Sequence, residues 1–378
     1  MFELDDFHAP EPQSVWQTLT QVLGGFAPSS GCDLPGAVGD TISNLAAQLV
    51  PEGTIVRNLQ YTGNIALQLG PPSEHPDLVI VAHMDRPSYR VRSMAENGTG
   101  ELFPICAIRL PAGAYRTGAR AFRFEGGELV TGATGSFVAE PKPSPESGHS
   151  LYFEASEGHL TYWDTVVLDT PPTLDEAPGQ IISTGLDNAL GVTVSLLTAG
   201  AVAQIAQDLG RSCWFVFTDH EEGPPDGYFF SQGADRLTRA VAPPRIGVIN
   251  VDAHNAGDNL PVKVAQGASY SITGGDGKGS VVPPNYASLL RYLGEHLNNA
   301  ELARVQHNNG YLSRSDDMPL HRWSRLLALI GPPLMHAHTG YETANLNDVV
   351  DAISLLTHVV ALALGASPAA TKAYHLNF

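Results

Sequence analysis

Three short apolar runs recur along the chain, and each is followed within two residues by an acidic or imidazole side chain. The runs cover residues 78–82, 213–217 and 246–251. Each is five or six residues long and rich in Val, Ile and Phe, which favours a strand buried on both faces. We therefore expect three core strands, with the polar groups that follow them lying at the strands' carboxyl ends.

Longer segments with apolar residues at helical spacing alternate with these runs. They cover residues 38–49, 188–206, 284–298 and 347–365. In the last segment, Val349, Ile353 and Leu356 lie on one broad apolar face. The alternation predicts an α/β fold in which a mainly parallel sheet is flanked by helices on both sides.

Residues 88–179 have a different pattern. Short β-type runs, for example at 105–108, 121–124 and 151–153, are separated by clusters of Gly, Pro and Ser. We expect a small β-barrel or sandwich inserted into the α/β domain. The α/β domain would then consist of residues 1–87 and 180–378.

Composition and charge limit the classes of function. A chain of 378 residues with 43% hydrophobic content can bury a sizeable core. The formal net charge of −18 argues against nucleic acid or an anionic membrane as a partner. The three cysteines show no CxxC spacing, and we expect them to be reduced, as in a cytoplasmic protein. We see no signal-peptide pattern and expect no membrane span.

The polar groups at the strand ends have the chemistry of a centre for two metal ions. Two divalent cations about 3.5–4 Å apart need a bridging carboxylate, further His and carboxylate ligands, and a separate base for a shared water. Five segments supply such groups in order along the chain. The candidate residues are His83, Asp85, Asp187, Glu221, Glu222, Asp252 and His338.

Local spacing suggests roles for some of these residues. The two-residue step from His83 to Asp85 lets the carboxylate turn back and accept the second ring N–H, which would fix the ligating tautomer. We therefore expect Asp85 to support His83. Glu221 and Glu222 are neighbours at the exit of a strand and should point different ways. One can bind metal while the other acts as general base, and the spacing leaves open which does which.

Other interpretations stay open at this point. Asp187 could be the N-cap of the helix predicted over 188–206, which does not exclude a ligand role. His336 and His338 are two residues apart, so either could be the ligand in an extended segment. The acidic turn at 313–317 could contact substrate or cap a helix.

The order and spacing of several short motifs resemble the tetrahedral aminopeptidases, a dodecamer-forming group of two-metal exopeptidases that includes glutamyl and deblocking aminopeptidases. The motifs are Thr62-Gly63-Asn64, Ala82-His83-Met84-Asp85, Leu186-Asp187-Asn188, His220-Glu221-Glu222-Gly223, Val251-Asp252 and His338-Thr339-Gly340-Tyr341-Glu342. The resemblance implies that Asp187 bridges two ions. His83 and Asp252 would complete one site, Glu222 and His338 the other, and Glu221 would be the base. In the family a Glu follows the ligand histidine by four residues. Glu342 has this position relative to His338, which selects His338 over His336.

The resemblance also implies substrate, cofactor and assembly. We expect hydrolysis of the N-terminal residue from short peptides with two divalent ions, zinc first, with cobalt or manganese as alternatives. The inserted β-rich domain would mediate dimerisation within a homo-oligomer, of which a dodecamer is one form.

Two departures from the family pattern lie beside the predicted ligands. Arg86 follows the first motif where the family has Glu, and Asn188 follows Asp187 where the family has Asp. They leave open an amidohydrolase or deacylase acting on a non-peptide amide. A non-catalytic metal-binding subunit is the alternative from another class of function.

Overall fold

The three apolar runs form neighbouring parallel strands at the centre of one sheet. In the computed structural model, which describes residues 7, 9–106, 109–142, 148–223, 230–275, 279–312 and 315–376, these strands are β3 (Leu78–His83), β12 (Cys213–Thr218) and β13 (Gly247–Val251). They lie in the order β12-β3-β13. Every residue in them is buried, which explains why the runs are continuously apolar.

Five more strands complete an eight-stranded sheet. The parallel part continues through β17 (Leu326–Gly331), beside β13. Beyond it lie β15 (Ala268–Ser271), antiparallel to β17, and then β16 (Val305–His307). The other edge is formed by β2 (Ile65–Leu69) and β1 (Thr54–Val56), both antiparallel to their neighbours. The prediction of a mainly parallel sheet is confirmed.

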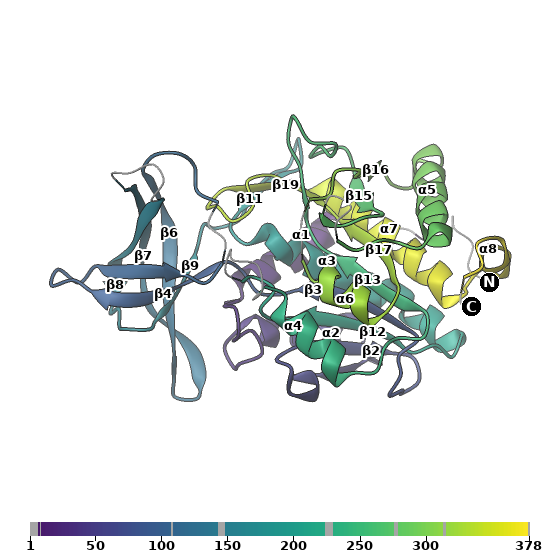
Figure 1. The fold of residues 1–378 in the computed structure, drawn as a ribbon, viewed down its shortest axis with the longest axis horizontal. Coiled ribbons are helices and arrows are strands. Elements are labelled where there is room, and N and C mark those ends of the chain that lie inside the picture. Colours follow the sequence, from purple (N-terminus) through teal and green to yellow (C-terminus); the bar gives the residue numbers. More distant parts are fainter. Residues whose placement is uncertain are drawn as a thin grey trace.

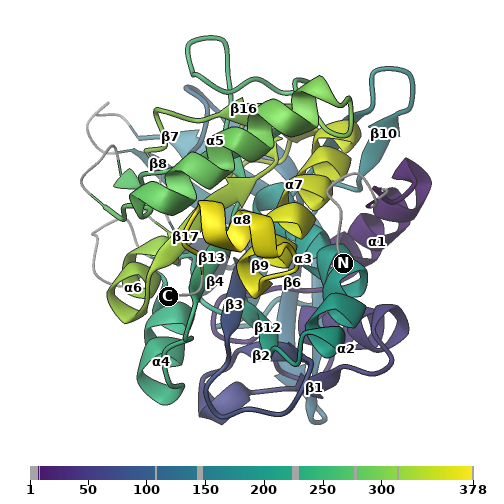
Figure 2. The ribbon, with the colours of Figure 1, turned by 90° about the vertical axis from the view of Figure 1, so that its right-hand side faces the viewer.

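Helices cover both faces of this sheet (Figures 1 and 2). Alternate residues of β3 show the two faces, since Ile80 lies in the larger apolar core and Val81 in the smaller one. The helices that line the larger core are α1 (Pro12–Gly24), α2 (Val38–Leu49), α3 (Leu186–Asp208), α5 (Pro284–Asn299) and α7 (Leu346–Leu364). The smaller core contains α4 (Gln232–Ala240) and α6 (Asp317–Trp323). All four segments predicted as helices are helical.

Two of the core helices, α3 and α7, are long and apolar enough to cross a membrane by length and composition alone. Of the most apolar stretch of each, 78% and 83% of the residues are buried inside the protein. Core helices of globular domains show such burial.

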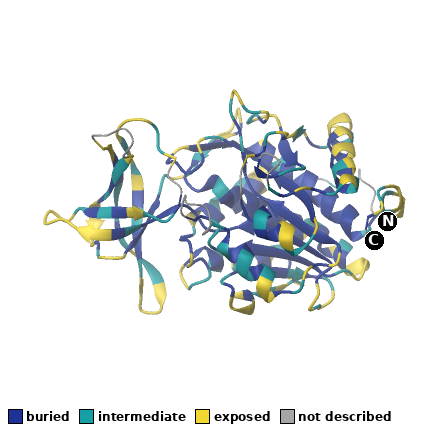
Figure 3. Cartoon of the chain, in the orientation of Figure 1, coloured by how far each residue is buried: buried dark blue, intermediate teal, exposed yellow. Residues whose placement is uncertain are grey.

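The inserted β-rich region is a closed barrel that projects from one end of the α/β domain (Figure 1). Its strands run in the order β4-β5-β8-β7-β6-β9. They are β4 (Ser88–Met94), β5 (Gly100–Pro104), β6 (Tyr115–Glu125), β7 (Glu128–Pro141), β8 (His149–Gly158) and β9 (Thr165–Leu168). The barrel has its own apolar core, whose largest members include Tyr89, Phe137 and Phe153. Its hairpin ends are exposed, and its strands carry buried, half-buried and exposed residues (Figure 3).

The details of the insert differ from the sequence prediction in one place. The run expected at 105–108 is not a strand where it is described, because β5 ends at Pro104, and residues 107–108 lie outside the described part. The runs at 121–124 and 151–153 lie within β6 and β8 as expected.

After the barrel the chain returns through small sheets that border the site. The strand β10 (Thr173–Asp175) pairs with β11 (Gln180–Ser183), which in turn pairs with β19 (Glu342–Asn345). A two-stranded pair, β14 (His254–Asn255) and β18 (Pro333–Leu334), extends beyond the carboxyl ends of β13 and β17. These short strands hold the segments that precede α3 and α7.

Candidate metal centre

Three candidate residues lie at the carboxyl ends of the three central strands. His83 is the last residue of β3, Glu222 follows β12, and Asp252 directly follows β13. Because these strands are parallel neighbours, their ends meet at one edge of the sheet, where open α/β sheets bind ligands. The three side chains are buried, with 2–6% of their residue surface exposed.

Asp187 and His338 reach the same place from other elements. Asp187 lies at the start of α3 with non-helical backbone angles, and His338 lies between β18 and β19. The helix cap is supplied by Asn188, whose Oδ1 accepts the backbone N–H of Gly191 at 2.9 Å. Among the described residues the side-chain bond to the first turn of α3 thus comes from Asn188, and the helix assignment places Gly185 at the N-cap, so the interpretation of Asp187 as the N-cap is not supported.

The distances between donor atoms are those of two adjoining metal sites. His83 Nε2 lies 3.3 Å from Asp187 Oδ1 and 3.5 Å from Asp252 Oδ1. His338 Nε2 lies 3.5 Å from Asp187 Oδ2 and 3.1 Å from Glu222 Oε1. Two donors bound at about 2.0–2.1 Å to one tetrahedral ion are about 3.3 Å apart. Asp187 turns one oxygen toward each imidazole, which is the arrangement a bridging carboxylate needs.

The described residues contain two groups of three side chains that could each hold a metal ion. One is His83, Asp187 and Asp252, and the other is Cys106, Glu222 and His338. Within each group the donor atoms lie within 4.8 Å of one another. The first group and two members of the second were predicted from the sequence. Cys106 was not, because no motif or spacing marks it.

Asp85 connects the two groups by hydrogen bonds. Its Oδ1 accepts the backbone N–H of Glu221 at 2.9 Å, and its Oδ2 accepts that of Glu222 at 3.1 Å and the hydroxyl of Ser29 at 2.7 Å. The ring Nδ1 of His83 lies 3.5 Å from Asp85 Oδ1 and 3.2 Å from its backbone oxygen. Asp85 therefore faces the nitrogen of His83 that points away from the ligand group.

The carboxylates of this cluster outnumber its imidazoles, and bound cations would stabilise this excess of negative charge. Its carboxylates are Asp85, Asp187, Glu221, Glu222 and Asp252, against the two imidazoles of His83 and His338. Burial raises the pKa of Glu221 well above its ordinary value, and the neighbouring Glu222 and Asp252 add to this against the opposing effect of His83. Burial alone would lower the pKa of His83, but the surrounding carboxylates raise it strongly. A buried excess of carboxylates is costly unless cations compensate it.

The neighbouring histidines are engaged elsewhere. The ring of His336 packs on Tyr341 with 5.0 Å between ring centroids. His220 Nδ1 lies 2.5 Å from the hydroxyl of Ser30, and His254 Nδ1 lies 2.6 Å from that of Ser269. None of the three is a member of the ligand groups found among the described residues, whereas His338 is.

Arg86 and Asn188 have structural contacts that the sequence did not indicate. The buried guanidinium of Arg86 donates to the carbonyl oxygens of Leu23, at 3.0 Å, and Val22, at 2.8 Å, at the C-terminal end of α1. Besides capping α3, Asn188 donates through Nδ2 to the carbonyl of Val251 at 2.9 Å. Both side chains are used to hold backbone segments together.

The acidic turn before α6 supports a predicted ligand. Residues 313–314 lie outside the described part. The hydroxyl of Ser315 donates to Asp252 Oδ2 at 2.5 Å, and the buried Asp316 accepts the hydroxyl of Thr218 at the end of β12. No side-chain cap bond forms at the start of α6, so the capping alternative does not hold there. The sequence marks this turn as polar, but nothing in its spacing indicates the hydrogen bond from Ser315 to Asp252.

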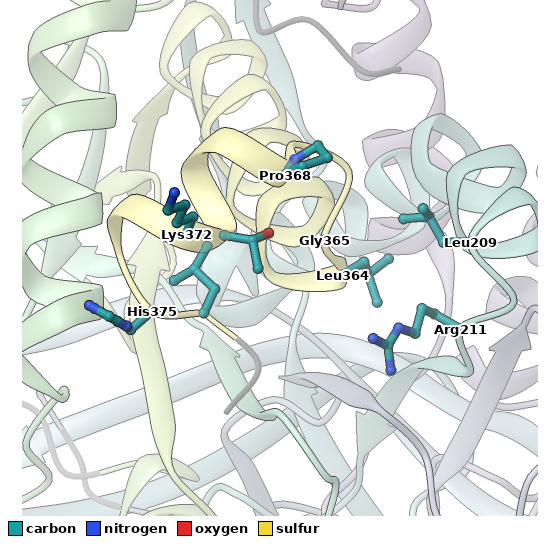
Figure 4. Close-up of a pocket in the computed structure, with 9 residues that line it drawn as sticks. Leu209, Arg211, Leu364, Gly365, Pro368, Lys372 and His375 are labelled. Carbon is teal, nitrogen blue, oxygen red and sulfur yellow. The ribbon is translucent and has the colours of Figure 1, made fainter.

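A cavity of about 550 Å³ lies at the opposite end of the strands from these groups. Arg211, Leu364, Lys372 and His375 are among its lining residues (Figure 4). Arg211 precedes β12, whereas Glu222 follows it, so a six-residue strand, about 20 Å long, separates the cavity from the ligand groups. The cavity is therefore not part of the candidate metal centre.

Comparison with known proteins finds similarity of structure without similarity of sequence. No protein-family model and no curated protein matches the sequence. Aminopeptidase APDkam598 from the archaeon Desulfurococcus kamchatkensis superimposes with a TM-score of 0.73 at 17% identity, covering 96% of this chain and 98% of that one. A TET aminopeptidase from a marine sediment archaeon of the Thaumarchaeota gives 0.74 at 13% identity, covering 96% and 99%.

A third similar structure is the TET1 peptidase of Pyrococcus horikoshii, which is described as able to assemble into a tetrahedron or a large octahedral shell. It gives a TM-score of 0.67 at 16% identity, and the match covers 91% of this chain and 99% of that one. The match includes both the α/β domain and the barrel, since so little of either chain is left out. The chain therefore has the fold of these solved aminopeptidases, at 13–17% sequence identity.

Proposed function

We propose that this protein is a two-metal aminopeptidase that removes the N-terminal residue from short peptides. One observation carries the proposal: Asp187 turns one carboxylate oxygen toward His83 and the other toward His338, at 3.3 and 3.5 Å. His83, Asp187 and Asp252 would hold one ion. Asp187, Glu222 and His338 would hold the second.

Bound there, two divalent ions would supply Lewis acidity toward a water molecule and toward the scissile carbonyl. Glu221 belongs to neither ligand group, although it adjoins Glu222. Its backbone N–H donates to Asp85, and this hydrogen bond holds the Glu221 side chain beside the ligand groups. In our proposal it accepts the proton of the attacking water and passes it to the leaving amine. Asp85 orients His83 and both glutamates without touching the substrate.

The alternative of an amidohydrolase or deacylase has lost the features that favoured it. It depended on Arg86 and Asn188, which depart from the family pattern beside the predicted ligands. Both are instead occupied by backbone carbonyl or amide groups. The non-catalytic alternative does not explain why a carboxylate in neither ligand group adjoins the centre. We therefore propose peptide hydrolysis alone.

Metal identity, assembly and location complete the proposal. Mixed His and carboxylate ligands suit zinc, and they also suit cobalt or manganese. We propose a homo-oligomer built from dimers through the barrel, in keeping with the assembly described for the Pyrococcus horikoshii peptidase.

We also propose a cytoplasmic location, with neither nucleic acid nor membrane as a partner, given the net charge of −18. The division of the chain at residues 88 and 179 remains part of the proposal.

The test is a metal titration followed by a substrate panel. The purified protein is stripped with a chelator, and the stoichiometry of zinc, cobalt and manganese is measured by calorimetry. Each loaded form is then assayed on aminoacyl anilides, on unblocked peptides and on N-acetylated copies of the same peptides. We expect two ions per chain and cleavage of unblocked peptides only. Cleavage of the acetylated peptides at equal rates would contradict an aminopeptidase, and absence of bound metal would contradict the whole proposal.

A further inference from the structure

We propose that Cys106 is a thiolate ligand of the metal held by Glu222 and His338, which makes the two metal sites chemically unequal. The inference rests on the proposed two-metal centre and adds a ligand to it. Cys106 lies just after β5 of the inserted barrel, whereas the other ligands belong to the α/β domain. The barrel would then take part in the metal centre directly.

The first observation in support is that Cys106 lies beside Glu222 and His338. Its sulfur lies with a carboxylate oxygen of Glu222 and a ring nitrogen of His338 in a group whose donor atoms are all within 4.8 Å of one another. The residue is fully buried. A sulfur bound at about 2.3 Å and a nitrogen bound at about 2.0–2.1 Å to one tetrahedral ion are about 3.6 Å apart. The limit of 4.8 Å within which the donor atoms lie exceeds this spacing by about 1.2 Å, a difference that side-chain rotation can remove when a common ion binds.

A second observation at the same place is independent of the cysteine. Glu222 is 4% exposed, and its Oε1 accepts no hydrogen bond from the described residues. A buried carboxylate oxygen without a donor is costly, and a bound cation would compensate it. This oxygen lies 3.1 Å from His338 Nε2, so the atoms that need a cation are those that Cys106 adjoins.

The other two cysteines lie elsewhere and provide a comparison within the same chain. The thiol of Cys32 donates to the carbonyl of Pro28 at 3.3 Å. Cys213 begins β12, at the opposite end of that strand from Glu222. Both are buried and unbridged, as Cys106 is, but neither is a member of a ligand group among the described residues.

A thiolate at one site predicts a preference among metals. Soft sulfur ligands favour zinc and cobalt over manganese and magnesium, which prefer oxygen. The site of His83, Asp187 and Asp252 has no sulfur and should be less selective. On binding, the S–H bond of Cys106 is replaced by a sulfur–metal bond, and one proton is released to the buffer.

The test is electronic absorption of the cobalt-substituted protein. The chelator-stripped enzyme is titrated with Co²⁺, and the near-ultraviolet thiolate-to-cobalt charge-transfer band is followed together with the visible bands that report cobalt in any ligand field. We expect the charge-transfer band in the unmutated protein, its loss in Cys106→Ser, and its retention in the matched control Cys213→Ser. We also expect the zinc affinity of one site to fall by at least about tenfold in Cys106→Ser.

A complementary variant covers the case in which Cys106→Ser does not fold. In the double variant Cys32→Ser, Cys213→Ser, Cys106 is the single thiol of the chain, and we expect the charge-transfer band to persist. Two bound cobalt ions without a charge-transfer band would overturn the thiolate ligand while leaving the two-metal centre intact. A band that survives in Cys106→Ser would also overturn it. Failure to bind cobalt at all would overturn the proposed function together with this inference.

Discussion

The carboxylate of Asp85 accepts the backbone N–H of Glu222 at 3.1 Å, although the two residues are 137 positions apart. The same carboxylate faces His83, so one group fixes the end of β12 relative to the end of β3. A ligand on each of these strands is thereby held in place before any metal arrives. Such supporting groups commonly affect metal affinity nearly as strongly as ligands do.

Replacing Asp85 should weaken metal binding. The carboxylate of Asp85 now accepts hydrogen bonds from two backbone N–H groups, and in Asp85→Asn the NH₂ group would face at least one of these donors. His83 would also lose the negative charge beside its Nδ1 atom. We expect the zinc affinity to fall by about 10–100-fold, measured by competition with a chromophoric chelator. The control is Asp175→Asn, the same change at an exposed residue of β10. Equal affinities in the two variants would contradict the supporting role.

The adjacent glutamates should separate metal binding from proton transfer. Glu221→Gln should keep two ions per chain and lower kcat by about 10²–10⁴-fold, because only the base is lost. Glu222→Gln should instead lose affinity for one ion. Metal content by atomic absorption and kcat on the best anilide distinguish the two. If Glu221→Gln lost an ion and Glu222→Gln kept both, the roles would have to be exchanged.

Arg86 should matter for stability and not for substrate. In Arg86→Met the carbonyls of Val22 and Leu23 lose buried charged donors, and we expect the free energy of unfolding to fall by about 2–3 kcal/mol. The methionine keeps much of the side-chain volume, so kcat/KM per folded, metal-loaded molecule should stay within about twofold. Urea denaturation and steady-state kinetics measure the two effects. A large loss of kcat/KM at unchanged stability would return Arg86 to the substrate site.

Tyr286, which lies on α5 far from the predicted ligands in sequence, predicts a dependence of stability on pH. Its buried hydroxyl has no hydrogen-bond partner among the described residues, and burial raises its pKa to about 12. Since its pKa in the unfolded chain is about 10, ionisation favours unfolding as the pH rises from about 10 toward 12. Tyr286→Phe removes both the unpaired hydroxyl and this dependence.

We therefore expect Tyr286→Phe to raise the free energy of unfolding by about 1 kcal/mol at pH 8. At pH 11 the difference between the two proteins should be larger by about 1.4 kcal/mol. Urea denaturation of the metal-free proteins at both pH values measures this, and titration of other groups is common to the pair. A difference that stays constant between the two pH values would show that Tyr286 does not titrate with a raised pKa.

The central strands were predictable because they are buried on both faces. Burial on both faces requires apolar residues at consecutive positions, and such a run is visible in the sequence. The residues after them, such as His83 and Asp252, could be grouped because parallel neighbours end at the same edge. Cys106 could not be found this way. It reaches Glu222 only because the barrel closes and docks beside the sheet, and such a contact between residues 116 apart leaves no local pattern.

The contacts of Arg86 and Asn188 could not be predicted for a related reason. Each adjoins a predicted ligand in the sequence and departs from the family pattern, which left the class of substrate open. The partner of Arg86 is the end of α1, more than 60 residues earlier, and one partner of Asn188 is Val251. Hydrogen bonds of this kind depend on the tertiary fold and are invisible to spacing along the chain.

The contact between Arg86 and Gly185 has a consequence for how the two parts of the molecule are joined. Arg86 lies between β3 and the first strand of the barrel, and Gly185 lies between β11 and α3, after the chain has returned from the barrel. A Cβ atom on Gly185 would come within 2.3 Å of Arg86 Cδ, so the two crossing points touch. Two crossings in contact restrict each other, so a side chain larger than hydrogen at position 185 would displace Arg86 and with it the start of the barrel. The barrel is also held at places away from these crossings, because Phe26 of the α/β domain stacks on Phe122 and the backbone N–H of Gly340 donates to the hydroxyl of Tyr115.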